Sequence, residues 1–266
     1  MDLGDRMKEY ERVTRTYLTR RVPVIIRLDG KAFKTFTSGL KKPFDEIFRA
    51  AMMHTAKYLC ENIQGCKFAY TQSDEITLLL TDYENINTEA WYNYNVSKMT
   101  SISASMCSVA FNKFFMDLVG EYKSLNYFND GEEIKNYIST LKRKLMTAVF
   151  DSRVFNIPKE EVCNEFLWRQ RDAIRNSIQS VARCYLGGKL DNKSNEILRE
   201  LLKEKGEEYM WEKQPRKYTV GVCVYKESAL DFPFDSDEYK ESRKSWVINE
   251  MIPNFSADRQ YIEKHL

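Results

Sequence analysis

Histidine is scarce in this chain. Only two histidines, His54 and His265, occur among the 266 residues. We expect His265, the penultimate residue, to be frayed, so a Ser-His-Asp triad, a Cys-His pair or a multi-histidine zinc site would rest on His54 alone. Apolar spacing places His54 off the buried face of its predicted helix, at the surface or its boundary. We therefore discount all three kinds of chemistry.

Paired cysteines and long apolar runs are absent as well. The six cysteines form no Cys-x-x-Cys pair and lie in segments typical of strands and helices, so we expect them to be reduced and buried. No run approaches the roughly 20 apolar residues that span a bilayer, and the N-terminus is charged from its second residue, unlike a signal peptide. The sequence predicts a cytoplasmic protein without a membrane partner.

An excess of charge of either sign is also missing. Lysine and arginine number 41 against 39 acidic residues, a net charge of +2, which excludes a polybasic arm. A chain of this length hides about three quarters of its unfolded surface, so compositional disorder is excluded too. Aromatic residues reach 13%, enough for core packing and for stacking on bases.

The apolar periodicity predicts alternating strands and helices. The β-branched run 24–28 is typical of a strand buried on both faces, and it stops at Asp29 and Gly30. Two short runs around Gln72-Ser73-Asp74-Glu75 have the pattern of a hairpin. The full order is an amphipathic helix over 3–20 packed on the main body, a strand over 24–28, a helix from 43 to before 65, strands over 67–71 and 76–80, helices over 88–115 and 133–148, and a strand over 150–155.

This order predicts an α+β fold of the ferredoxin-like type, a split β-α-β antiparallel sheet with helices on one face. In that plan the third strand runs antiparallel to the first. The C-terminal end of the first strand then lies beside the N-terminal end of the third. We therefore expect Asp29 to lie next to Asp74 and Glu75.

The pattern of the sequence changes after residue 155, where helical periodicity becomes dominant. A long helix over 158–185 and a charged helix over 194–206 precede a strand near 218–225 that returns to the core. The stretch 226–266 mixes Pro, Asp, Ser and Lys, which predicts an irregular, partly mobile tail. We divide the chain into a catalytic domain over 1–155, N-terminal helix included, and a helical C-terminal region over 156–266.

Carboxylates at converging strand ends, without histidine, suit hard cations such as Mg²⁺ with substrate phosphates. Two such ions about 4 Å apart activate a hydroxyl and stabilise the phosphate that it attacks. The alternative is that Asp29 belongs to a plain turn and Asp74 caps a hairpin. A cluster of lysines after the first acid favours a polyphosphate ligand, although it is also compatible with a solvated loop; it comprises Lys31, Lys34, Lys41 and Lys42.

Three further features have two interpretations each. Lys98 either lies along the core flank or faces a phosphate. Arg169, Arg171 and Arg175 form a basic stripe that either follows a nucleic-acid backbone or pairs with Asp172 and Glu165. Ser73 lacks a histidine partner, so its hydroxyl is a better ligand than nucleophile.

Several motifs together resemble the tRNA-histidine guanylyltransferase family. They fall in order between residues 20 and 225. They are Arg27-Leu28-Asp29-Gly30-Lys31-Ala32-Phe33, Lys42-Pro43, Tyr70-Thr71-Gln72-Ser73-Asp74-Glu75, Ser97-Lys98, Phe150-Asp151-Ser152-Arg153 and Trp168-Arg169-Gln170-Arg171-Asp172.

The resemblance implies a polymerase-like palm, a homotetramer, and 3′ to 5′ addition of nucleotides to the 5′ end of tRNA, with nucleoside triphosphates and tRNA as partners. It implies that Asp29, Asp74 and the Gly30 carbonyl bind two Mg²⁺ ions, with Glu75 as a supporting catalytic residue. The implied nucleotide contacts are Asp29, Gly30, Lys31, Ala32, Phe33, Lys34, Lys42, Ser73, Asp74, Lys98 and Asn176.

One motif departs from the family pattern. Enzymes that add the extra guanylate to histidine tRNA carry His-Ile-Asn-Asn where this chain has Ile174-Arg175-Asn176-Ser177. This resembles the bacterial or archaeal guanylyltransferase-like branch, which implies template-directed repair of tRNA shortened at its 5′ end, after ATP or GTP activates the 5′ phosphate. The alternatives are guanylate addition to histidine tRNA, a nucleotidyl cyclase, which here lacks the Gly-Gly-Asp/Glu hairpin, and a catalytically silent RNA-binding protein.

Overall fold

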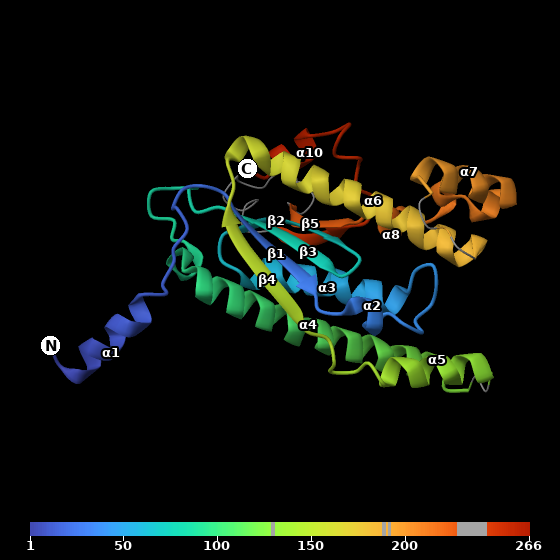
Figure 1. The fold of residues 1–266 in the computed structure, drawn as a ribbon, viewed down its shortest axis with the longest axis horizontal. Coiled ribbons are helices and arrows are strands. Elements are labelled where there is room, and N and C mark those ends of the chain that lie inside the picture. The colour runs from blue at the N-terminus through green and yellow to red at the C-terminus, as the bar shows by residue number, and fades with distance from the viewer. Residues whose placement is uncertain (129–130, 188–189, 191–192, 228–243) are drawn as a thin grey trace, which may run out of the picture.

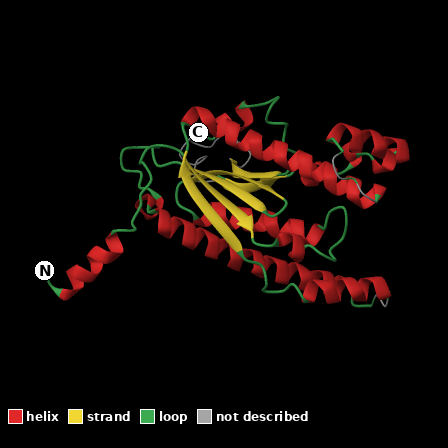
Figure 2. Ribbon diagram, viewed as in Figure 1, coloured by secondary structure: helices red, strands yellow, loops and turns green. Residues whose placement is uncertain are grey.

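The computed structural model describes residues 1–266 except 129–130, 188–189, 191–192 and 228–243. At its centre lies a six-stranded sheet with the order β4-β1-β3-β2-β5-β6, in which every neighbouring pair is antiparallel. Helices lie on both sides of the sheet (Figure 2). The strands are β1 (Val24–Gly30), β2 (Cys66–Gln72), β3 (Glu75–Leu80), β4 (Phe150–Asn156), β5 (Val222–Glu227) and β6 (Ser245–Asn249).

The register of the sheet assigns its residues to two faces. Asp29 of β1 lies opposite Glu75 on β3 and opposite Asp151 on β4. Because side chains alternate along a strand and paired residues share a face, these three carboxylates lie in one row on the same face. The row that lies two residues earlier on β1 is centred on Arg27, opposite Thr77 and Arg153.

The face opposite the acids packs against the first helices of the chain (Figure 1). Even-numbered β1 residues such as Ile26 and Leu28 are fully buried there. α3 begins after Asp45, whose carboxylate accepts a hydrogen bond from the Phe48 N–H at 3.0 Å, a normal N-cap. The helices on this side are α2 (Phe33–Phe36), α3 (Glu46–Asn62), α4 (Val96–Leu125) and α5 (Glu132–Lys142).

The other face is partly covered by α6 (Val162–Leu186) and by the C-terminal residues around α10 (Gln260–Glu263). Phe166 of α6 packs edge-on against Phe68 of β2, with ring centroids 5.0 Å apart. α7 (Asn195–Lys205) packs on the end of α6, as Figure 1 shows. The remaining helical turns are α8 (Arg216–Thr219) and the 3-10 turns Trp91–Tyr94, Lys159–Glu161, Glu207–Tyr209 and Trp211–Lys213.

The predicted α+β fold is confirmed, as are the strands around 24–28, 67–71, 76–80 and 150–155. The strand expected near 218–225 is β5, which pairs with β2. The domain boundary at residue 155 stays a prediction.

Three structural expectations are wrong. The N-terminal helix, α1, ends at Arg12, has no buried residue and projects from the body instead of packing on it (Figure 1). The tail expected to be irregular contains β6, which pairs with β5; residues 228–243 lie outside the described part. His265 is half-buried and stacks on Phe68 with ring centroids 5.0 Å apart, so it is not frayed.

The cysteines and α4 differ in part from what the sequence predicts. Five cysteines are free and buried, but Cys184 is free and exposed. α4 is long and apolar enough, by length and composition alone, to cross a membrane, which the sequence had not led us to expect. Its residues Cys107, Phe111 and Phe115 are buried in the core, because α4 packs lengthwise on α3 and β4. It is therefore a core helix of this fold.

Candidate active site at the ends of β1 and β3

Asp29, Asp74 and Glu75 come together at one end of the sheet, as the strand order predicts. Asp29 and Glu75 are register partners, and the Gly30 N–H donates to the Asp74 carbonyl at 3.1 Å. A side chain at position 30 would overlap the Phe33 ring, so the close approach after Asp29 requires glycine.

The hairpin turn orients the second acid. Ser73 takes a positive φ of 50°, and its hydroxyl donates to Asp74 Oδ1 at 3.0 Å. This left-handed turn residue allows Asp74 to lie at the tip of the hairpin instead of in a strand. Asp74 therefore faces the region beyond the end of β1.

Burial is the main cause that raises the pKa values of both aspartates. For Asp29 the next cause is the neighbouring Asp151, whereas the nearby Arg153 and Arg27 lower its pKa. For Asp74 the charge of Asp29 raises the pKa, and the hydrogen bond from Ser73 lowers it. The protein therefore compensates the ionised carboxylates only in part, and a bound cation would complete the compensation.

The donor set fits a hard divalent cation. It comprises the Asp29 and Asp74 carboxylates and the Gly30 carbonyl, all oxygen donors of the type that Mg²⁺ prefers. Within the described residues no group of three or more His, Cys, Asp or Glu side chains forms a metal site. Substrate phosphates and water would complete the coordination of any ion held here.

Glu75 has a different environment from the two aspartates. Its Oε2 accepts a hydrogen bond from Arg169 Nη1 at 2.9 Å, and both side chains are less than one tenth exposed. Burial raises the pKa of Glu75, while Arg169 lowers it. Placing Arg169 in an exposed tRNA-binding stripe is therefore wrong, because this guanidinium is held inside the protein by Glu75.

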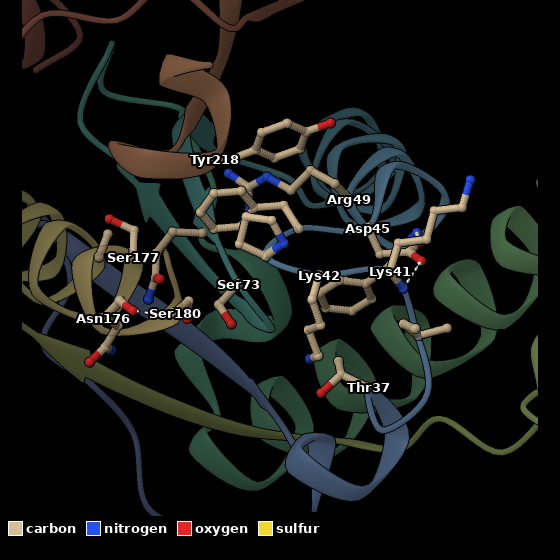
Figure 3. Close-up of a pocket in the computed structure, with 16 residues that line it drawn as sticks. Thr37, Lys41, Lys42, Asp45, Arg49, Ser73, Asn176, Ser177, Ser180 and Tyr218 are labelled. Carbon is tan, nitrogen blue, oxygen red and sulfur yellow. Dashed lines mark hydrogen bonds between the residues drawn. The ribbon is translucent and has the colours of Figure 1, made fainter. Parts of the chain in front are cut away.

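A cavity of about 170 Å³ opens beside the hairpin tip. Lys42, Ser73 and Asn176, three of the predicted nucleotide contacts, line it together although they come from distant parts of the chain (Figure 3). The volume is below the roughly 300 Å³ of a complete small-ligand pocket, so it suits one part of a nucleotide. The Lys42–Pro43 peptide bond on its rim is cis.

Sequence reasoning missed several residues of this cavity. Arg49 lies on its wall, fully buried, and donates to the carbonyls of Lys217 and Thr71. Burial lowers its pKa to about 10. Phe44 and Tyr218 stack at the cavity edge with ring centroids 4.9 Å apart. No sequence signal singled out Arg49, because it lies off the apolar face of the predicted helix that Phe48 and Ala51 mark.

A comparison with protein-family models matches residues 4–158 to the tRNAHis guanylyltransferase family. This match covers more than half of the chain. The chain belongs to the tRNAHis guanylyltransferase family. It is therefore a nucleotidyltransferase, and the palm-like fold predicted from the resemblance is that of its family.

Relatives and solved structures agree with this membership. A mimivirus protein of unknown function, from Acanthamoeba polyphaga mimivirus, is 30% identical over 85% of this chain and 77% of its own. A probable tRNA(His) guanylyltransferase of Dictyostelium discoideum is 28% identical over 63% of this chain and 56% of its own.

Among solved structures, a bacterial guanylyltransferase-like protein in complex with ATP covers 99% of both chains, with 35% identity and a TM-score of 0.78. The same kind of protein in complex with GTP has 33% identity and a TM-score of 0.75, over 99% of this chain and 98% of that chain. The tRNA(His) guanylyltransferase of Saccharomyces cerevisiae, at 19% identity and a TM-score of 0.60, covers 81% of this chain and 91% of that chain and shows the same fold.

Not all the residues that the family resemblance implied gather at the cavity. Lys31 and Ala32 are exposed between β1 and α2, and Lys34 is exposed within α2. The Phe33 ring, in contrast, is buried against Phe36, Phe111 and Phe150. Only the backbone of Phe33 is therefore available to a nucleotide.

Lys98 does not line the cavity either. It is exposed in the first turn of α4. Further along α4, Ser103 contacts Ser152, and Ser108 contacts Phe150. Because the later α4 residues lie at the acidic end of β4, Lys98 lies towards the opposite end. Its triphosphate contact stays a prediction.

The two other arginines of the predicted basic stripe are exposed on α6. Arg175 pairs with Asp172, as the alternative interpretation proposed. Arg171 is exposed on the same side of the helix. Whether either contacts tRNA stays a prediction.

Proposed function

We propose that this protein is a Mg²⁺-dependent 3′ to 5′ nucleotidyltransferase that rebuilds the 5′ end of shortened tRNA. The observation that carries the proposal is the meeting of Asp29 and Asp74 beside a cavity lined by Lys42, Ser73 and Asn176. Family membership supports tRNA as substrate. The ATP and GTP complexes of the bacterial relatives support nucleoside triphosphates.

The proposed reaction has two steps. The 5′ monophosphate of the tRNA attacks the α-phosphorus of ATP or GTP, and pyrophosphate leaves. The 3′-hydroxyl of the incoming triphosphate then attacks the activated 5′ phosphorus, and the nucleoside monophosphate leaves. Base pairing with the 3′ strand selects the incoming nucleotide. Bound Mg²⁺ supplies the positive charge that acidifies the attacking hydroxyl and stabilises the phosphates.

The protein's own residues position these groups. Asp29, Asp74 and the Gly30 carbonyl present oxygen atoms to the cation. Ser73 orients Asp74 through their hydrogen bond. Lysine side chains at 31, 34 and 42 supply positive charge for the triphosphate. Arg169 holds Glu75 in place next to Asp29, its register partner in the sheet.

One residue of this chain favours repair of truncated tRNA over guanylate addition to histidine tRNA. Ile174 stands where the guanylate-adding enzymes carry histidine, and here it is half-buried between two apolar clusters. It therefore offers no imidazole and faces the interior. The 35% identity with a bacterial guanylyltransferase-like protein supports the same branch.

The test uses purified protein, Mg²⁺, labelled nucleotides and a tRNA lacking its first nucleotide. We expect extension of the truncated tRNA, and weaker addition to full-length histidine tRNA. Asp29→Asn and Asp74→Asn should abolish extension while circular dichroism stays unchanged. Asp117→Asn, which removes an exposed aspartate paired with Lys113 on α4, is the matched control and should remain active.

The products separate the alternatives. A cyclic nucleotide would identify a cyclase, and RNA binding without a product would identify a silent RNA-binding protein. Retained extension in either Asp29→Asn or Asp74→Asn would refute the proposed metal site.

We also propose that the protein is cytoplasmic and that it associates with further copies of itself. Leu3, Met7 and Tyr10 on the projecting α1 are exposed, which supports contact with another copy of the chain in a homotetramer. Light scattering of the full chain and of a Leu3→Ser, Met7→Ser, Tyr10→Ser variant tests this. An unchanged mass would refute the role of α1.

A further inference from the structure

Trp168 is an unusual surface residue. It lies on α6, next to Arg169, and is 52% exposed. The Arg169 guanidinium lies over its ring at 3.5 Å from the centroid, and the Arg27 guanidinium lies 5.5 Å from it. A large indole ring is thus held by two arginines and still presents half its surface to solvent.

The sheet register places this ring close to the acids. Arg27 is two residues before Asp29 on β1, and both side chains point to the α6 side of the sheet. Two strand residues span about 7 Å, roughly two stacking steps of 3.4 Å in a nucleic acid. A base stacked on Trp168 would therefore be a near neighbour of a nucleotide at Asp29.

Positive charge surrounds the ring. Arg153 lies opposite Arg27 in the register of β1 and β4, and its side chain is 55% exposed. Arg171 is exposed three residues along α6 from Trp168, so it lies on the same side of the helix. Arginines beside an exposed aromatic ring match the chemistry of a single RNA strand, in which bases stack and phosphates are neutralised.

We infer that Trp168 is the platform on which the terminal base of the substrate RNA stacks, with Arg153 and Arg171 neutralising the adjacent phosphates. The inference rests on the proposed function and adds to it the place of the RNA 5′ end. The contact with Arg169, which also holds Glu75, fixes the ring relative to the acids.

A structural role is the competing explanation, because the Trp168 ring covers the buried pair of Arg169 and Glu75. Three variants separate the two roles. Trp168→Phe keeps an aromatic face, Trp168→Leu keeps apolar cover without a stacking face, and Trp246→Leu is the control. Trp246 also has a cation over its ring, Lys226 at 5.5 Å, but it lies on β6, at the sheet edge opposite β4.

The experiment titrates the full chain with an acceptor-stem hairpin RNA carrying a 5′ monophosphate, without nucleotide. We expect saturable quenching of tryptophan fluorescence that disappears in Trp168→Phe, while the RNA affinity of that variant stays within about threefold of wild type. Trp168→Leu should bind about tenfold to a hundredfold more weakly, and Trp246→Leu should bind as wild type does. Urea unfolding of each variant checks the fold.

Wild-type affinity and wild-type KM for RNA in Trp168→Leu would overturn the platform. If the wild-type protein extended the RNA in that case, the proposed function would stand and only the role of Trp168 would be refuted. Quenching that depends on Trp168 without any extension would support the platform and refute the proposed function instead.

Discussion

The buried pair of Glu75 and Arg169 allows a quantitative prediction. Both side chains are less than one tenth exposed, and Nη1 and Oε2 are 2.9 Å apart. Removing one partner of such a pair leaves a charge in a site of low dielectric constant, which costs about 3 to 5 kcal/mol. Arg169→Met, which has similar length and no charge, should lower the free energy of unfolding at pH 8 by this amount.

The loss should depend on pH with a defined sign. Burial already raises the pKa of Glu75, and Arg169 opposes that effect. Without Arg169 the pKa rises further, so the folded protein favours the protonated carboxyl. The deficit is therefore present above the folded-state pKa and shrinks as the pH falls through it. Urea unfolding at pH 8 and pH 5 should show a smaller difference from wild type at pH 5.

A double variant isolates the pair. Glu75→Gln with Arg169→Met removes both charges and should regain at least about 2 kcal/mol of the loss at pH 8. Both variants lose the contact of Arg169 with Trp168, so that contact cancels in the comparison. A loss below about 1 kcal/mol in Arg169→Met, or a double variant less stable than the single one, would refute the reasoning.

Two further predictions concern pH. Ser73→Ala removes the hydrogen bond that lowers the pKa of Asp74, so on acidification nucleotide addition should be lost at a higher pH than in wild type; coinciding pH profiles would contradict this role. Burial beside Phe68 lowers the pKa of His265 to about 4, so the folded state favours the neutral ring, and stability should fall as the pH drops from about 6.5 towards 4. Because the ring is half-buried, we expect this loss of stability to be about 1 to 2 kcal/mol and to be absent in His265→Phe. If thermal unfolding across that pH range gives the same slope for both proteins, the assignment to His265 is refuted.

The central strands and the acid pair were predictable because their signals are local or follow from topology. The apolar run before Asp29 and the two runs around the Ser73 turn mark strands by composition. The antiparallel pairing of the first and third strands then brings Asp29 and Glu75 together across 46 positions of sequence. Neither step needs side-chain detail.

The strand β6 was missed for a physical reason. Residues 245–249 contain a run of only three apolar residues, Trp246 to Ile248, in a polar tail, and they form a strand by pairing with the edge of β5. His265 was misjudged for the same kind of reason, since its position near the chain end says nothing about the aromatic residues that it meets.

The environment of Arg169 in the site likewise depends on contacts that the local sequence does not reveal. Helical spacing places Arg169 nearer than Arg171 to the apolar face that Phe166 and Ala173 mark, but it does not identify a partner for the guanidinium. Only the line along which α6 crosses the sheet decides that Arg169 points inward to Glu75 while Arg171 stays exposed.

The sequence by itself determined the central strands, the acids at their ends and the exclusion of histidine chemistry, because hydrophobic periodicity and residue type are properties of the chain alone. The tertiary structure decided which charges are buried, which residues line the cavity and where Trp168 stands. These depend on contacts between segments as distant as Glu75 and Arg169, 94 positions apart, and the free energy of a charge depends on the environment that such contacts create.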